Sequence, residues 1–242
     1  VDFNEADKKI SLSVKALFAP EVSEKEEAKA EDDADVVSVD IDAVIALANS
    51  EKVRIVIFSN PCNPTSRIVT KDDVRKLINS VESLVVLDEA YMDFAEDESL
   101  LGEFRNYDNL IILKTCSKAL GCAALRLGFA VANKTLTNVI RAVKSPYNVN
   151  SVSQALGEVL FSHPDYIDDC IKTVVNSRKE LYSAILEIKS DKIEKVYETH
   201  TNFVFMKVKN AKLVFEKMKE NSIIIRNMGD YLRITAGSKE EN

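Results

Sequence analysis

Histidine and cysteine are scarce in this sequence of 242 residues. The two histidines are His163 and His200, so a Ser-His-Asp triad would need one of them as its general base. The four cysteines form no C-x-x-C pair and have no histidine cluster nearby, which argues against a zinc site and against a disulfide framework. We interpret both histidines as surface or packing residues, and the cysteines as free thiols of a reducing compartment.

Long apolar runs and a surplus of positive charge are also absent. No apolar stretch reaches the roughly 20 residues that a membrane-spanning helix requires, and no charged-then-apolar start indicates a signal peptide. With a net charge of -7, the sequence predicts no basic surface for a nucleic-acid backbone or an anionic membrane. We therefore expect neither nucleic acid nor membrane as a partner, and we expect a cytoplasmic protein.

The six glycines do not form a phosphate-binding loop, because the motif G-x-x-x-x-G-K-[ST] does not occur. This absence bears on the pair Asp88-Glu89, which follows an apolar run. Such a pair would otherwise resemble the magnesium-binding strand of a P-loop ATPase. The missing loop argues against that interpretation.

Short apolar segments alternate with helix-like segments over the middle of the chain. The predicted strands cover 53–59, 84–87, 109–113 and 127–132, and the predicted helices cover 42–48, 71–81 and 135–144. Continuous apolar strands that alternate with helices are typical of a mostly parallel sheet covered on both faces. We therefore expect an α/β fold with three layers, whose large domain spans residues 1–145.

A break at Ser145-Pro146 separates this pattern from a second one. Helical periodicity covers 151–161, 164–187 and 211–220, and strand-like runs cover 203–208, 223–226 and 231–235. We expect a smaller C-terminal α/β domain over residues 146–242. Near the other end, residues 21–35 hold eight acidic side chains, which predicts a solvated helix or a mobile segment.

Polar motifs follow three of the predicted strands. SNPCNPTS follows the first, DEAY the second and TCSKA the third. Ligands of an open parallel sheet bind outside the carboxyl ends of its strands, so Asn63, Asp88 and Lys118 are expected to face one site. A positioned lysine amine becomes a nucleophile toward carbonyl groups once it is deprotonated.

These residue types suit pyridoxal 5'-phosphate. That cofactor needs an amine for a Schiff base, a carboxylate at its ring nitrogen, donors to its phenolate oxygen and ligands for its phosphate. Lys118 is the predicted amine and Asp88 the predicted carboxylate. The predicted phenolate donors are Asn63 and Tyr91, and the predicted phosphate ligands are Thr115, Ser117 and Arg126.

In order and spacing, the runs SNPCNPTS, VVLDEAYMDF, TCSKALGCAALRLGF and YLRITAG resemble the fold-type-I pyridoxal-phosphate aminotransferases. The resemblance covers Val53 to Asn242 and is greatest to the histidinol-phosphate aminotransferase branch. It implies that Lys118 forms the Schiff base and then shuttles a proton, and that Asp88 keeps the ring nitrogen protonated. It also implies a homodimer that transfers an amino group from a small-molecule donor to a 2-oxo acid. Histidinol phosphate and 2-oxoglutarate, the pair used in histidine biosynthesis, are the expected substrates.

The same resemblance assigns the substrate side of the site. Arg233, in YLRITAG, matches the family arginine that binds the substrate carboxylate, and Arg226 resembles one that reaches a distal phosphate. Asn63 belongs to this substrate set as well. The implied catalytic residues are Lys118, Asp88 and Tyr91, and no metal site is expected.

Two other functions remain open on the sequence alone. A related decarboxylase of phosphorylated amino acids, of the threonine-phosphate type, uses the same residues with another substrate orientation. A truncated, cofactor-free interaction protein would keep the fold without the chemistry. The first differs from an aminotransferase in its product, and the second in lacking a Schiff base.

The sequence departs from the family pattern in two respects. Ser66 stands where glycine is usual, and a serine has less conformational freedom than glycine in such a turn. Family members also carry a glycine-containing phosphate loop, a ring-stacking aromatic residue and a tyrosine lent to the neighbouring subunit, none of which is recognisable within residues 1–50. We therefore expect an incomplete copy whose cofactor affinity is reduced.

Overall fold

The computed structural model describes residues 2–4, 9–11, 39–95 and 98–242. The chain divides into two units, Val1–Ser38 and Val39–Asn242. In the first unit, strand β1 (Asp2–Asn4) pairs antiparallel with strand β2 (Lys9–Ser11). The acidic segment 21–35, for which a helix or mobile segment is predicted, lies outside the described residues.

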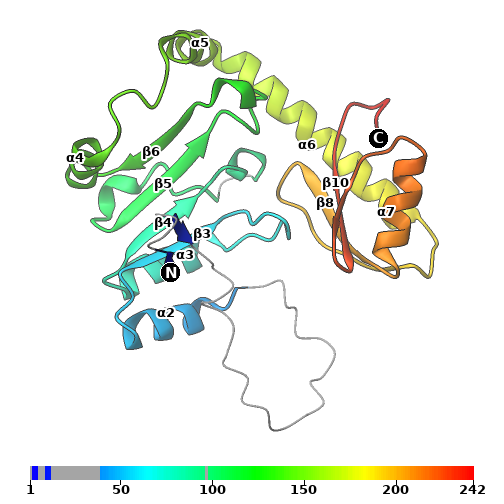
Figure 1. Ribbon diagram of the computed structural model, residues 1–242, viewed down its shortest axis with the longest axis horizontal. Helices are drawn as coiled ribbons and strands as arrows, with labels where there is room; N and C mark the ends of the chain where they lie inside the picture. The colour runs from blue at the N-terminus through cyan, green and yellow to red at the C-terminus, as the bar shows by residue number, and fades with distance from the viewer. Residues whose placement is uncertain (1, 5–8, 12–38, 96–97) are drawn as a thin grey trace. The chain divides into compact units, whose positions relative to one another are not determined.

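The second unit contains a four-stranded sheet with the order β3-β4-β5-β6 (Figure 1). Its strands are β3 (Ile55–Ser59), β4 (Leu84–Asp88), β5 (Leu110–Thr115) and β6 (Gly128–Ala132). The β3–β4 and β4–β5 pairs are parallel and the β5–β6 pair is antiparallel, which confirms a mostly parallel sheet. Asp88 lies opposite Ser59 and Leu113, so the first three strands end at the same edge.

Helices α2 (Ile41–Ser50) and α3 (Lys71–Ser80) cover one face of this sheet (Figure 1). The hydroxyl of Thr70 accepts a hydrogen bond from the Asp73 backbone at 3.2 Å, which caps the start of α3. Apolar side chains of both helices pack against alternate residues of β4 and β5. The buried core comprises Ile41, Ala48, Val74, Leu77, Ile78, Val81, Val85, Leu87, Leu100, Leu110 and Ile112.

Three helices follow the sheet, and each begins at a recognisable signal. They are α4 (Lys134–Val143), α5 (Ser151–Phe161) and α6 (Pro164–Glu187). Asn133 and Asn150 cap the first two through their side-chain oxygens, and Pro164 occupies the first turn of α6. Helices α5 and α6 have the predicted bounds.

A second four-stranded sheet has the order β7-β8-β10-β9 and is antiparallel throughout. It contains β7 (Ile193–Val196), β8 (Phe203–Val208), β9 (Arg226–Met228) and β10 (Tyr231–Thr235). Helix α7 (Ala211–Glu220) and the C-terminal half of α6 bury its apolar residues. The two sheets lie on opposite sides of residue 145 in the sequence, although a domain boundary there stays a prediction.

The predicted strand 223–226 is wrong in position, because β9 begins only at Arg226. Gly229, with φ of 74°, and Asp230 form the connection that pairs Met228 with Tyr231. A two-residue connection fixes the register of a hairpin. The ladder therefore starts at Arg226, and Ile225 packs into the core instead of pairing. Among the described helices, none has the length and apolar character needed to cross a membrane.

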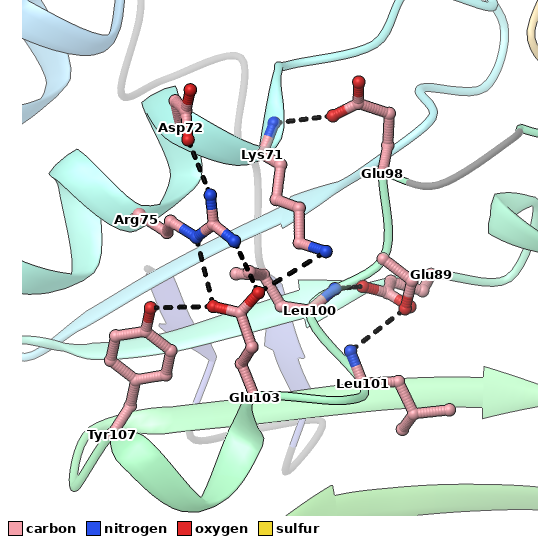
Figure 2. A network of polar contacts seen from close by, with 10 residues as sticks. Lys71, Asp72, Arg75, Glu89, Glu98, Leu100, Leu101, Glu103 and Tyr107 are labelled. Atoms are coloured by element: carbon pink, nitrogen blue, oxygen red, sulfur yellow. Dashed lines mark hydrogen bonds and ion pairs between the residues drawn. The ribbon is translucent and has the colours of Figure 1, made fainter.

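A charged network attaches α3 to the segment after β4 (Figure 2). The Glu103 carboxylate accepts hydrogen bonds from Arg75 Nε at 3.0 Å and Tyr107 Oη at 3.4 Å, and Lys71 Nζ lies 3.4 Å away. The guanidinium of Arg75 also contacts Asp72 at 2.6 Å. The hydrogen bonds from Arg75 lower the pKa of Glu103 from 4.5 to about 2.

Replacing Glu103 with glutamine tests this network. A carboxyl whose pKa is lowered by folding stabilises the protein when the pH is above the pKa that the group has in the unfolded chain. This contribution is lost as the pH falls toward the pKa of the folded state. Glu103→Gln should therefore lower the urea midpoint of unfolding at pH 7, with the difference closing between pH 4.5 and about 2. The exposed Glu82→Gln is the control. An equal deficit at pH 3 and pH 7 would contradict the assignment.

Candidate active site

The predicted ligands at the strand ends lie along one edge of the first sheet. Asp88 is the last residue of β4. Asn63 follows the end of β3 by four residues, and Lys118 follows the end of β5 by three. Parallel pairing brings these three segments together because adjacent strands in register end side by side.

Tyr91 lies at the centre of the contacts among these residues. Asn63 Nδ2 donates a hydrogen bond to its hydroxyl at 3.5 Å, and Lys118 Nζ lies 5.2 Å from the centroid of its ring. The ring is buried and packs edge-on against Phe203 at 5.5 Å. The contact with Lys118 has cation–π geometry, which holds the ammonium group over the ring face. Tyr91 thus connects the β3 and β5 loops.

Arg233 brings the second sheet into the same cluster. It lies in β10, and its Nη1 donates a hydrogen bond to Asn63 Oδ1 at 2.6 Å, across 170 residues of sequence. Its guanidinium carbon lies 4.9 Å from the centroid of the Phe203 ring. Its Nε is buried and has no hydrogen-bond partner among the described residues. A buried donor without an acceptor is costly, and a ligand carboxylate would satisfy it.

Asp88 has a half-buried carboxylate fixed by its own loop. Its Oδ1 accepts a hydrogen bond from the Ala90 backbone at 3.0 Å, and its backbone carbonyl accepts one from Asn60 at 2.9 Å. Only one carboxylate oxygen is engaged in this way among the described contacts. The second oxygen is available to a proton donor, as the predicted role requires.

The three predicted phosphate ligands are only partly brought together. Thr115 Oγ1 accepts a hydrogen bond from the Ser117 backbone at 3.1 Å, so these two share one turn. Arg126 has a left-handed backbone with φ of 53°, and its exposed guanidinium donates to the Ala123 carbonyl at 3.0 Å. No hydrogen bond within the described part of the chain joins Arg126 to Thr115 or Ser117.

Arg226 is the cross-strand neighbour of Arg233 in the β9–β10 ladder. Directly paired residues project from the same face of a sheet, with Cβ atoms about 4.5–5.5 Å apart. Two like charges in this relation repel each other, and an anion bound between them would remove the repulsion. Arg226 is exposed, and no hydrogen bond or ion pair among the described residues joins it to another predicted ligand.

Two charged residues of the site region, Glu89 and Lys114, were given no role in the predicted site by the sequence. Glu89 is fully buried and accepts hydrogen bonds from Ser99 Oγ at 2.6 Å and the Leu100 backbone at 3.2 Å. Lys114 Nζ lies 2.6 Å from Asp93 Oδ1 and 3.8 Å from Glu89 Oε2. Burial raises the pKa of the Glu89 carboxyl. The network anchors the residue that immediately follows Asp88.

Strand alternation could have revealed this pair. Val85 and Leu87 point to the buried face of β4, and the same alternation continues to Glu89. In β5, Ile112 points to the buried face, and the same alternation places Lys114 on that face. Opposite charges at two positions where the pattern demands apolar side chains indicate a buried ion pair.

A cavity of about 540 Å³ lies beside the Lys118 loop. Its lining residues are Asp93, Leu101, Lys114, Thr115, Cys116, Leu120, Phe129, Val131, Phe161, Ile167, Asp168 and Ile171. Thr115 is the one predicted ligand among them. The cavity therefore does not enclose the cluster around Tyr91.

Removing the positive charge of Lys114 should destabilise the fold. Lys114→Met leaves Glu89 and Asp93 without their cation, and we expect a loss of about 2 kcal/mol in the free energy of unfolding at pH 7. The raised pKa means that Glu89 favours folding when protonated and opposes it as the pH rises above 4.5. The deficit measured by urea unfolding should therefore be smaller at pH 5, and Glu89→Gln should partly rescue the variant. A loss of unfolding free energy that does not change with pH would contradict an ion pair between Lys114 and Glu89.

Comparison with known proteins gives the family. The family model for aminotransferase class I and II matches residues 27–242. The histidinol-phosphate aminotransferase of Clostridium kluyveri is 40% identical over 210 residues, covering 85% of this chain and 59% of that protein. The enzyme of the same name from Clostridium novyi is 44% identical over 209 residues, covering 84% of this chain and 58% of that protein.

Solved structures show the same fold. The histidinol-phosphate aminotransferase from Clostridium acetobutylicum superposes with a TM-score of 0.75 at 22% identity, covering 84% of this chain and 64% of that one. The enzyme from Sinorhizobium meliloti, solved in complex with pyridoxal-5'-phosphate, has a TM-score of 0.74 at 22% identity, covering 84% of this chain and 58% of that one. These neighbours confirm the fold-type-I architecture.

The chain spans less than two thirds of the curated relatives that it matches, 59% of the Clostridium kluyveri protein. The match nevertheless runs through all four predicted motifs and extends to the last residue. The chain belongs to the class I and II aminotransferase family.

Proposed function

We propose that this chain is the core of a pyridoxal-phosphate-dependent aminotransferase that acts on histidinol phosphate with 2-oxoglutarate as acceptor. The observation that carries the proposal is the contact chain Lys118–Tyr91–Asn63–Arg233. It links the predicted amine to the predicted carboxylate-binding arginine through the predicted phenolate donors. The names of the relatives support the substrate assignment.

The chemistry of the available groups fits pyridoxal phosphate. Lys118 supplies an exposed primary amine beside the Tyr91 ring, and Asp88 supplies a carboxylate with one free oxygen. The side chains of Asn63 and Tyr91 can both donate hydrogen bonds. Thr115, Ser117 and Arg126 would hold the phosphate, with Arg126 turning away from the Ala123 carbonyl.

When bound, the cofactor supplies an aldehyde that condenses with amines and a ring that delocalises the electron pair left at a substrate α-carbon. The role of Asp88 is to hold a proton on the ring nitrogen, since a nearby anion favours the protonated form. Asn63 and Tyr91 would orient the ring by donating hydrogen bonds to its oxygen. Lys118 Nζ, as a free amine, takes the proton from the α-carbon.

Arg233 and Arg226 account for the choice of substrate. The buried Nε of Arg233 and its guanidinium fork suit a planar anionic group such as a carboxylate. Arg226, its cross-strand partner, adds a second positive charge on the same sheet face. Two neighbouring cations favour substrates with an anionic group away from the amine, as a phosphorylated amino alcohol has.

The direct test of the function is an assay of the full chain with pyridoxal phosphate, histidinol phosphate and 2-oxoglutarate. We expect glutamate to form, and borohydride to trap the cofactor on a peptide that contains Lys118. Lys118→Ala should reduce turnover by at least about a thousandfold, whereas the exposed Lys134→Ala should not. Equal labelling of Lys118 and Lys134 would reject the assignment.

The same assay separates the other functions. Carbon dioxide released from O-phosphothreonine, without glutamate, would identify a phosphoamino-acid decarboxylase instead. One fold neighbour is the L-threonine-O-3-phosphate decarboxylase from Porphyromonas gingivalis, with a TM-score of 0.68 at 23% identity, covering 78% of this chain and 61% of that one. No visible absorption band after addition of pyridoxal phosphate would favour a cofactor-free protein.

The role proposed for Arg226 makes a separate prediction about selectivity. Arg226→Ala should reduce the preference for histidinol phosphate over histidinol by about tenfold to a hundredfold, because one charge-assisted contact to phosphate is lost. The ratio of kcat/KM for the two substrates measures this preference. Arg141→Ala, which removes an exposed arginine on α4, is the control. An unchanged ratio in Arg226→Ala would remove this residue from the site.

A further inference from the structure

We propose that Ser66 is a positioning residue whose hydroxyl fixes the Asn63 loop to the segment 199–203. The inference rests on the proposed function, because the groups that it positions are Asn63 and Arg233. A glycine, which the sequence analysis expects at this position, would have no side chain for this contact. We call the hydroxyl and its partners in 199–201 the Ser66 latch.

The hydroxyl of Ser66 is buried and makes several contacts. Its Oγ accepts hydrogen bonds from the backbone nitrogens of His200 at 2.8 Å and Thr201 at 3.1 Å. It also lies 2.8 Å from Thr201 Oγ1 and 3.1 Å from Thr199 Oγ1. Ser66 and Thr201 have no exposed surface. These contacts cross more than 130 residues of sequence, so they join separate parts of the fold.

The latch uses the full capacity of the hydroxyl. A serine hydroxyl has two acceptor lone pairs and one proton. The two backbone nitrogens occupy the lone pairs, and the proton is left for one threonine hydroxyl, with Thr201 the closer. Both threonine hydroxyls in turn donate to the Phe203 carbonyl. Removing the Ser66 hydroxyl would leave the N–H groups of His200 and Thr201 without this acceptor, and that of Thr201 is buried.

The backbone of Ser66 shows that the serine is retained at a cost. Its φ is 61°, in the left-handed region that glycine enters freely and other residues enter with strain. Glycine would remove this strain and the hydroxyl together. The three hydrogen bonds that the hydroxyl can make at one time offset the strain, which is the physical reason for a serine at this position.

The Ser66 latch is connected to the site through two segments, the Asn63 loop and residues 199–203. On one side, backbone hydrogen bonds Ser66–Cys62 and Cys62–Arg67, both 2.8 Å, close the loop on itself, so Asn63 is held together with Ser66. On the other side, segment 199–203 ends in Phe203, whose ring packs against Tyr91 and lies under Arg233. Fixing both sides maintains the hydrogen bond from Arg233 to Asn63.

The test compares Ser66→Ala, which keeps the strain and loses the hydroxyl, with Ser66→Gly, which loses both. Ser222 provides the matched control, since it also has a positive φ, of 64°, but is exposed. All variants are studied in the full chain at 15 °C, after circular dichroism has shown that they are folded. Ser66→Gly keeps the test available if strain makes Ser66→Ala unfold.

The first measurement needs no ligand and follows solvent exchange of the Arg233 Nε–H by NMR. In the intact latch this group is buried, and Nη1 of the same guanidinium donates to Asn63. Both Ser66 variants should raise its exchange rate by about tenfold, because the contact opens more often. Ser222→Ala and Ser222→Gly should change it by less than about twofold. Unchanged exchange in folded Ser66 variants would overturn the proposal and leave Ser66 a purely structural residue.

The second measurement is the dissociation constant for pyridoxal phosphate. The Ser66 variants should bind it about tenfold more weakly, because Asn63 is no longer held in place. Affinity within twofold of the parent chain would also overturn the positioning role. If the parent chain itself binds no pyridoxal phosphate, the proposed function fails, and the exchange measurement alone decides on the latch.

Discussion

The hydrogen bond between Asn63 and Arg233 is the contact on which the arrangement of the site depends. Asn63 belongs to the loop after β3, and Arg233 belongs to the second sheet. Without this contact, the edge of the first sheet would carry the amine, the carboxylate and the proposed phosphate ligands, with no arginine of the second sheet beside them to bind a substrate carboxylate. The chemistry proposed for the chain needs both sets of residues around one ligand.

Buried polar groups hold the loops on either side of this contact. Arg178, on α6, is 6% exposed and donates to the Phe94 and Thr201 carbonyls at 3.4 and 3.1 Å. Glu89 anchors the start of the segment between β4 and β5. These groups carry desolvation costs that apolar residues would avoid, so their value lies in fixing loops whose backbone must be satisfied. A site built from loops requires such support because loops pack little apolar surface.

The sequence predicted the elements whose signals are local. Helical periodicity predicted α5 and α6 at their observed bounds, and the motifs at the strand ends indicated the family. Features that depend on contacts between residues far apart in the sequence were not predicted. The hydroxyl of Ser66 has its partners more than 130 residues away, and the strand at Arg226 follows from a turn register rather than from its apolar run. The orientation of Arg126 was not predictable either. Its residue type suits phosphate, but residue type alone does not determine where a side chain points, and the guanidinium donates to the Ala123 carbonyl.

A double-mutant cycle on Asn63 and Arg233 tests most directly whether the two sheets form one site. The dissociation constant for pyridoxal phosphate would be measured for the parent chain, Asn63→Ala, Arg233→Ala and the double variant. A shared site predicts a coupling energy of about 1 kcal/mol or more, since each single change already breaks the same hydrogen bond. Effects that add to within about 0.3 kcal/mol would contradict the account and show that the residues act independently.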